Sequence, residues 1–191
     1  MNLFYEDYPT SIIVDGEDVQ IVTDFRDYIR LFDMLKDDSI SYSEKATILG
    51  QYFRTPPSDF SAAIEGLLSF VSMEGLPKCG MHGNDKSEEE EARQKEVYSF
   101  SVDYPFIFSA FLHEYGINIH TIKYMHWWVF RMLFDGLSDD TEIKKRIMYR
   151  SINLNEVKDK KERKQIERIQ NQIRLPDAEL SDYDIGDAFE W

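Results

Sequence analysis

The sequence predicts a mainly α-helical fold, with about six helices packed around a central aromatic-rich helix and a small β-hairpin at the N-terminus. Three observations lead to this prediction. Apolar residues recur at helical spacing along most of the 191-residue chain. The segment 121–136 is apolar on every side, which is typical of a helix buried at the centre of a domain. Two β-branched runs flank Asp15-Gly16, a pair that favours a tight hairpin turn.

The hairpin is predicted within "SIIVDGEDVQIV", residues 11–22. Gly16 can adopt the positive φ angle that the turn requires. A two-stranded hairpin alone is only marginally stable in water, so we expect it to lie against the helices.

Segments with a helical pattern follow the hairpin. Phe25, Ile29 and Phe32 share one face of the first segment. In the second, Ser41 and Glu44 stand at the spacing of a capping box. The expected helices fall within residues 23–37, 39–53, 55–71, 103–116, 121–136 and 138–150, followed by a basic helix within 155–175.

These elements divide the chain into four parts. We expect the hairpin at 1–22 and a helical core at 23–152, with a mobile acidic loop at about 74–96. A basic C-terminal helix is expected at 153–175 and an acidic, flexible tail at 176–191. The loop is assigned because its sequence is Gly-rich, polar and charged and has no apolar face.

Charge is distributed unevenly along the chain, whose net charge is −14. Residues 1–143 hold 11 basic and 26 acidic residues, and residues 144–174 hold 11 basic and 4 acidic residues, a net charge of +7. Residues 175–191 hold 6 acids and no base. The net negative charge disfavours binding to nucleic acids and to acidic membrane surfaces. We therefore expect neither as a partner.

Composition also bounds the compartment. No apolar stretch approaches the length of about 18 residues that spans a bilayer. Cys79 is the single cysteine, so no intrachain disulfide can form, which suits a reducing cytoplasm. We expect a soluble intracellular protein.

The histidines and the cysteine do not form a ligand set for a metal. His120 and His126 are six residues apart, which places them on different faces of a helix, and His113 lies in another segment. Cys79 and His82 resemble half of a zinc site without its second half. We expect no metal and no cofactor. The sequence also has no nucleophile elbow, phosphate-binding loop or dinucleotide fingerprint, so we expect no enzymatic activity.

The aromatic segment 121–136 allows two compatible interpretations, a buried core helix or a face presented to a partner. We expect one of the two adjacent tryptophans to lie half-exposed, because an indole N–H needs a hydrogen-bond partner. Together with the basic block and the aromatic tail, this segment supplies the candidate partner-binding residues. They are Trp127, Trp128, Arg131, Lys160, Lys161, Arg163, Phe189 and Trp191.

The segments "DYPFIFSAFLHEYGINI" and "MHWWVFRMLFDGLSDDTEIKKRIMYRSINLNEVKDKKERKQI" resemble a protein family of siphophages and prophages of Gram-positive bacteria. The resemblance extends over about residues 20–176, and the chain departs from it in an acidic insertion around 82–96. Members of this family are encoded beside the tape measure gene, as tail assembly chaperones are. The resemblance implies a non-enzymatic chaperone that binds the tape measure protein during tail morphogenesis in the host bacterial cytoplasm. A second tail assembly chaperone and the tail tube protein are further candidate partners.

Two alternatives remain open. The protein could be a structural or adaptor component retained in the phage tail. It could also be a host-directed inhibitor that imitates DNA with its acids, although the net +7 block argues against a continuous negative face.

Overall fold

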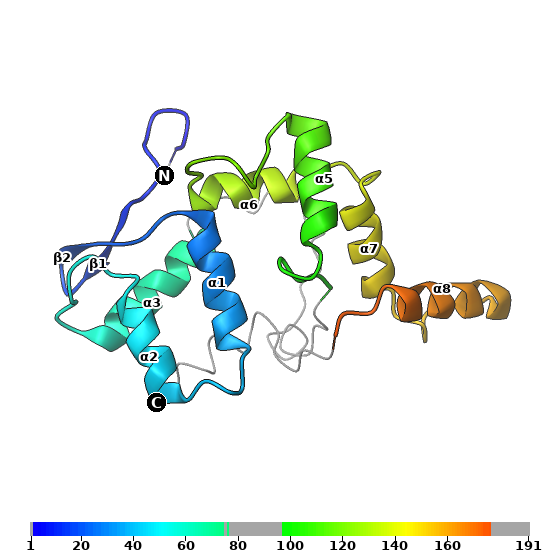
Figure 1. Ribbon diagram of the computed structural model, residues 1–191, viewed down its shortest axis with the longest axis horizontal. Helices are drawn as coiled ribbons and strands as arrows, with labels where there is room; N and C mark the ends of the chain where they lie inside the picture. Colours follow the sequence, from blue (N-terminus) through cyan, green and yellow to red (C-terminus); the bar gives the residue numbers. More distant parts are fainter. Residues whose placement is uncertain (1, 75, 77–96, 177–191) are drawn as a thin grey trace.

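The computed structural model describes residues 2–74, 76 and 97–176. Within these residues the chain is mainly α-helical, with one two-stranded antiparallel hairpin, so the predicted fold class is confirmed (Figure 1). The strands are β1 (Ser11–Val14) and β2 (Glu17–Gln20), and the helices are α1 (Phe25–Leu35), α2 (Tyr42–Gly50), α3 (Phe60–Val71), α5 (Tyr104–Tyr115), α6 (Trp127–Asp135), α7 (Glu142–Ser151) and α8 (Lys160–Gln172).

The hairpin forms where the sequence predicts it. Its turn consists of Asp15 at φ 51° and Gly16 at φ 82°, so both turn residues occupy the left-handed region. Ile12 of β1 lies over α3, where Gly66 leaves room: a Cβ atom on Gly66 would lie 3.0 Å from the Cδ1 atom of Ile12. The hairpin is therefore held by a close approach of β1 to α3 as well as by the pairing of its own two strands.

Local sequence signals set most helix ends. At the start of α2, the Ser41 side chain accepts from the Glu44 backbone N–H and the Glu44 carboxylate accepts from Ser41, which is the predicted capping box. Pro105 lies in the first turn of α5, and Gly116 ends that helix at φ 65°. The prolines at 56 and 57 precede α3 rather than starting it, because Asp59 accepts from the Ser61 and Ala62 backbone N–H groups and caps the helix there.

The central helix is shorter than predicted. It begins at Trp127, so the expected helix over 121–136 is wrong for its first six residues. Residues ahead of it pair with the chain before α1: the Phe25 N–H donates to the Met125 carbonyl at 3.0 Å, and the Trp127 N–H donates to the Thr23 carbonyl at 2.8 Å. His126 then caps α6 by accepting from the Trp128 N–H. These contacts between distant segments replace the first turns of the expected helix.

The aromatic core surrounds α6. Phe130 stacks between Phe25 of α1 and Phe111 of α5, with ring centroids 4.5 Å and 5.4 Å away. Trp127 packs against Tyr28 and Phe32 of α1. Large apolar side chains from α1, α5 and α6 thus form one continuous core, as the aromatic pattern of α6 predicts.

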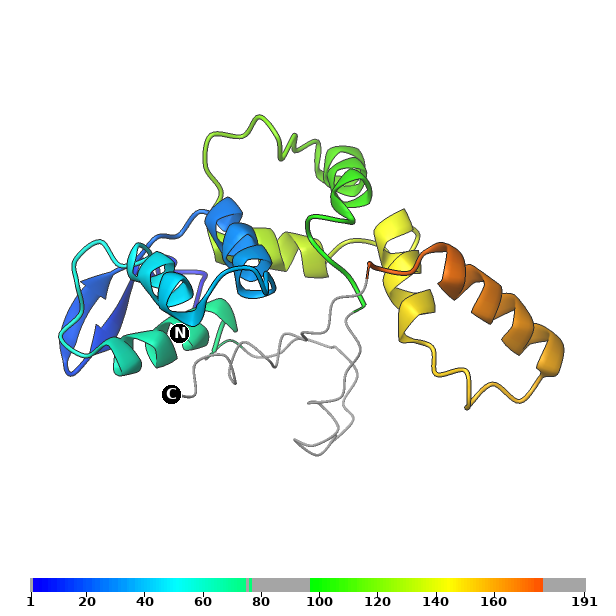
Figure 2. The same cartoon turned by 60° about the horizontal axis from the view of Figure 1, so that its bottom comes forward.

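The last two helices form a projection that we call the C-terminal arm, α7 and α8 with the segment between them. α7 packs against α5, and α8 packs against α7. Figures 1 and 2 show α8 extending away from the other helices, beyond α7. Among the 13 residues of α8, Ile166 alone is buried.

Candidate partner-binding surfaces

The two adjacent tryptophans are core residues. Trp127 is 0% exposed and Trp128 is 3% exposed, so the expectation that one of them is half-exposed is wrong. The indole N–H of Trp127 donates to the Val71 carbonyl at 3.0 Å, and that of Trp128 donates to the Phe70 carbonyl at 2.8 Å. Phe70 and Val71 end α3, where backbone carbonyls have no partner inside their own helix. The structure therefore satisfies both indoles internally, and neither ring is available to a partner.

Arg131 also makes contacts inside the protein. Its guanidinium donates to the Tyr98 hydroxyl at 3.1 Å and lies 5.6 Å from the centroid of the Trp127 ring. The hydrogen bond links the segment that contains Tyr98 to α6, whereas the Trp127 ring lies one turn earlier on α6 itself. Arg131 is thus half-buried between two elements rather than displayed on a surface.

The basic candidates on α8 are exposed. Lys160, Lys161 and Arg163 all lie on the surface, in and after the first turn of the helix. Asp159 caps this turn by accepting from the backbone N–H groups of Lys161 and Glu162. The remaining candidates, Phe189 and Trp191, lie outside the described residues. Of the eight predicted residues, the structure brings Lys160, Lys161 and Arg163 together on one accessible helix.

A buried ion pair attaches the arm to the core. Arg150 at the end of α7 makes two hydrogen bonds to the Asp103 carboxylate, at 2.6 Å and 3.0 Å, with both side chains buried. The same guanidinium donates to the Val97 carbonyl at 3.1 Å and to the Ile173 carbonyl at 2.7 Å. The sequence does not indicate this pair, because its members are 47 residues apart and no local pattern links them.

A second attachment joins α7 and α8 directly. The side-chain amide of Gln170 donates to the backbone carbonyls of Tyr149 and Ile152, at 2.7 Å and 2.8 Å. These two carbonyls lie at the C-terminal end of α7, where the Tyr149 carbonyl also accepts from the Ile152 N–H. Polar contacts therefore order a helix that buries little apolar surface.

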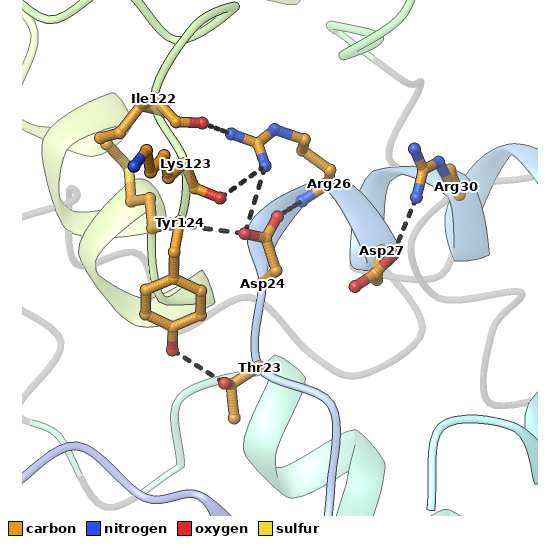
Figure 3. A network of polar contacts seen from close by, with 9 residues as sticks. Thr23, Asp24, Arg26, Asp27, Arg30, Ile122, Lys123 and Tyr124 are labelled. Carbon is orange, nitrogen blue, oxygen red and sulfur yellow. Dashed lines mark hydrogen bonds and ion pairs between the residues drawn. The ribbon is translucent and has the colours of Figure 1, made fainter.

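A polar network fixes the segment that leads into α6 (Figure 3). The Arg26 guanidinium donates to the backbone carbonyls of Ile122 and Lys123 and pairs with the Asp24 carboxylate at 3.4 Å. Asp24 also accepts from the Met125 N–H, and the Thr23 hydroxyl is hydrogen-bonded to the Tyr124 hydroxyl at 2.8 Å. The network holds α1 and residues 122–125 in register, and it fixes Arg26 at the edge of a groove.

This groove has a volume of about 510 Å³ and lies between α1 and α5, with α6 beneath it. Its lining is mainly apolar, with arginine, aspartate, serine, tyrosine and histidine at the mouth. The lining residues are Phe25, Arg26, Ile29, Arg30, Asp33, Phe100, Ser101, Tyr104, Ile107, Ile119, His120 and Phe130. Sequence analysis did not predict it, because helix spacing alone does not fix how far apart α1 and α5 lie on α6.

The histidines have structural surroundings. His126 is buried; its Nδ1 atom accepts from the Trp128 N–H, and its Nε2 atom bonds to the Pro9 carbonyl at 2.9 Å. Burial lowers the pKa of His126, an effect that the hydrogen bond to Pro9 partly opposes. His120 lies at the surface, 3.4 Å from the Tyr104 hydroxyl. Cys79 and His82 lie outside the described residues.

Within the part of the chain that the structure describes, no group of three or more His, Cys, Asp or Glu side chains is arranged to hold a metal ion. None of the helices in that part is long and apolar enough to cross a membrane.

The fold and these surfaces define a small helical protein with a closed aromatic core, a projecting basic arm and an apolar groove. Residues 5–175 match the family described as Bacteriophage Gp15 protein, so the chain belongs to this bacteriophage protein family. No match was found among curated proteins or among solved structures.

Proposed function

We propose that this protein is a non-enzymatic tail assembly chaperone that binds the tape measure protein in the host bacterial cytoplasm. Membership of a bacteriophage protein family supports a role in the phage particle or its assembly. The resemblance to proteins encoded beside the tape measure gene narrows that role to the tail.

The observation that carries the proposal is the separation of charge. The acidic body contains the closed core, while Lys160, Lys161 and Arg163 are exposed on a helix that extends away from it. A long, partly apolar helical partner aggregates unless its faces are covered before assembly. A chaperone with this distribution can hold such a partner through its arm while its net negative body keeps the complex soluble.

Release is as important as binding for a chaperone. Contacts through exposed charges are individually weak, at about 0–1 kcal/mol each. Many copies along one tape measure chain would compensate through multivalency, yet each copy could still be displaced when the tail tube protein arrives. A second tail assembly chaperone would share the same partner.

Co-expression with the tape measure protein, followed by affinity capture, tests the proposal. The wild-type chain should retain the tape measure protein in soluble form. Lys161→Glu should weaken retention at low salt, whereas Arg54→Glu, a matched charge reversal at an exposed residue of the body, should not. Residue 161 lies in the first turn of α8, where a glutamate suits the helix dipole, so the substitution should not unravel the helix.

The presence or absence of this protein in purified phage particles provides a second test. A chaperone that leaves before the tube is complete should be absent from them. Stoichiometric protein in the particles would instead support a structural or adaptor component retained in the tail, and failure to retain the tape measure protein in the cell would contradict the proposed function.

A further inference from the structure

The groove lies beside the central helix α6. α1 and α5 each pack against α6, and the groove runs between them. Its floor consists of side chains that are otherwise buried in the core: Phe25, Ile107, Ile119 and Phe130. An apolar channel bounded by two helices and floored by a third has the shape that an additional helix fills in a helical bundle.

Apolar surface continues from the groove along α5. Tyr104 at its mouth is 40% exposed, and Leu112, two turns further on the same face, is 45% exposed. Phe108 lies between them and contacts Tyr104, with ring centroids 5.9 Å apart. Exposed apolar side chains aligned beside an apolar channel are typical of a protein-binding surface.

Arg30 at the mouth can bind an acidic group, although Asp24 and Asp27 pair with the two arginines there. Two arginines and one aspartate line the groove, although the chain as a whole has a net charge of −14. Arg26 is fixed by the carbonyls of the segment before α6, and Asp33 accepts from the Ser101 hydroxyl at 2.5 Å. The Arg30 side chain is 74% exposed and contacts Asp27 on its own helix. An incoming carboxylate can therefore reach Arg30 without displacing any buried contact.

We propose that this groove is the docking site for an acidic amphipathic helix of the tape measure protein. The helix inserts a leucine or aromatic side chain between α1 and α5 and presents a carboxylate to Arg30. A volume of about 510 Å³ accommodates such an anchor, since binding pockets are commonly 300–1,000 Å³. The basic arm also favours an acidic partner. The groove and the arm can therefore bind successive parts of one acidic helical segment. This inference rests on the proposed function and specifies the part of the partner that is recognised.

A site-specific photocrosslink tests the location. p-Benzoylphenylalanine is introduced at position 104 at the groove mouth, or at position 42 on α2 as a matched control, since both positions hold exposed tyrosines. Each full-length chain is co-expressed with the tape measure protein and irradiated, and crosslinked peptides are identified by mass spectrometry. Position 104 should crosslink to an acidic helical segment of the tape measure protein, and position 42 should not.

Charge reversal tests the chemistry of the mouth. Arg30→Glu should weaken the affinity for the tape measure protein about fivefold at low salt, because it replaces an attraction with a repulsion. Arg54→Glu makes the same charge reversal at a residue that does not line the groove and should leave the affinity unchanged. Thermal melts of both variants establish that each is folded.

The outcomes separate the two proposals. If the wild-type chain retains the tape measure protein but position 104 gives no crosslink to it, or Arg30→Glu binds like Arg54→Glu, the groove is not the docking site and the proposed function stands. A crosslink from position 104 to a second copy of this chain also overturns the inference. If the wild-type chain does not retain the tape measure protein at all, both proposals fail.

Discussion

The central helix α6 and the terminal helix α8 are stabilised in opposite ways. Four of the nine residues of α6 are buried aromatic side chains, and each packs against rings from other segments of the chain. α8 buries one isoleucine among 13 residues and is attached mainly by hydrogen bonds from Arg150 and Gln170. The fold requires α6, because it forms the centre of the core. Contacts with the rest of the protein order α8, whose charged side chains are exposed. The residues that stabilise the fold are therefore different from those that we propose bind the partner.

The largest expected effect is the loss of a central aromatic side chain. Trp128→Ala should lower the free energy of unfolding by about 3–5 kcal/mol, because it leaves a cavity and removes the partner of the Phe70 carbonyl. Tyr5→Ala is the matched control at a residue that is 84% exposed, and it should change stability by no more than about 0.5 kcal/mol. Denaturant unfolding measures both. Equal effects in the two variants would contradict the central position of α6.

Loss of the buried ion pair should come next, and it should affect the arm most. Arg150→Met leaves the Asp103 carboxylate buried without its partner, which typically costs about 3 kcal/mol. Because Arg150 also binds the Ile173 carbonyl, hydrogen exchange should accelerate in α8 more than in α6.

The double variant Asp103→Leu with Arg150→Met serves as the control. It removes both charges, so it should recover part of the stability but none of the protection in α8. Uniform acceleration across the whole chain in the single variant would show that the arm and the core unfold as one unit.

The cap of α6 should make core stability depend on pH. The folded state lowers the pKa of His126, so its contribution is fully present above the ordinary value of about 6.5 and is lost as the pH falls through the lower folded value. Protonation of Nδ1 removes the acceptor for the Trp128 N–H, and the loss of a cap costs about 1 kcal/mol.

His126→Asn is the control for this prediction, because asparagine caps a helix without titrating near neutrality. The stability of the wild type relative to this variant should fall as the pH falls below about 6.5. Parallel curves from pH 8 to pH 4 would exclude His126 as the source of the dependence.

The smallest expected effect concerns the acidic segment 177–191, which lies outside the described residues. Its six acids are close in sequence to the basic arm, so we predict that it competes weakly for the arm with an acidic partner. Its deletion should tighten binding to the tape measure protein at low salt by at most about fivefold, and the gain should disappear as salt rises. If deletion abolishes binding, the segment is itself the recognition element, with Phe189 and Trp191 as anchors.

Local sequence signals predicted much of the fold. The capping box of Ser41 and Glu44, the turn at Gly16 and the end of α5 at Gly116 each depend on residues within a few positions of one another. The aromatic pattern correctly placed α6 at the centre, because a helix that is apolar on all sides has no polar face to expose to solvent. Exposure of the basic residues on α8 also follows from its sparse apolar pattern.

Contacts between distant segments account for what the sequence did not predict. The start of α6 is set by pairing with Thr23 and Phe25, about 100 residues earlier, and the indoles of Trp127 and Trp128 find carbonyls at the end of α3. The groove likewise depends on how α1 and α5 are placed on α6. Spacing along the chain does not contain this information, so the sequence alone left open whether the tryptophans form the core, a partner-binding face or both. The structure places them in the core.

Hydrogen exchange of the protein alone and in complex with the tape measure protein tests the central claim most directly. The account predicts added protection in α8 and along α1 and α5, the surfaces assigned to the partner. It predicts no change in α6, which the core already protects. Added protection confined to the hairpin, α2 and α3, or no added protection in any element, would contradict the division between a closed core and an arm and groove that bind the partner.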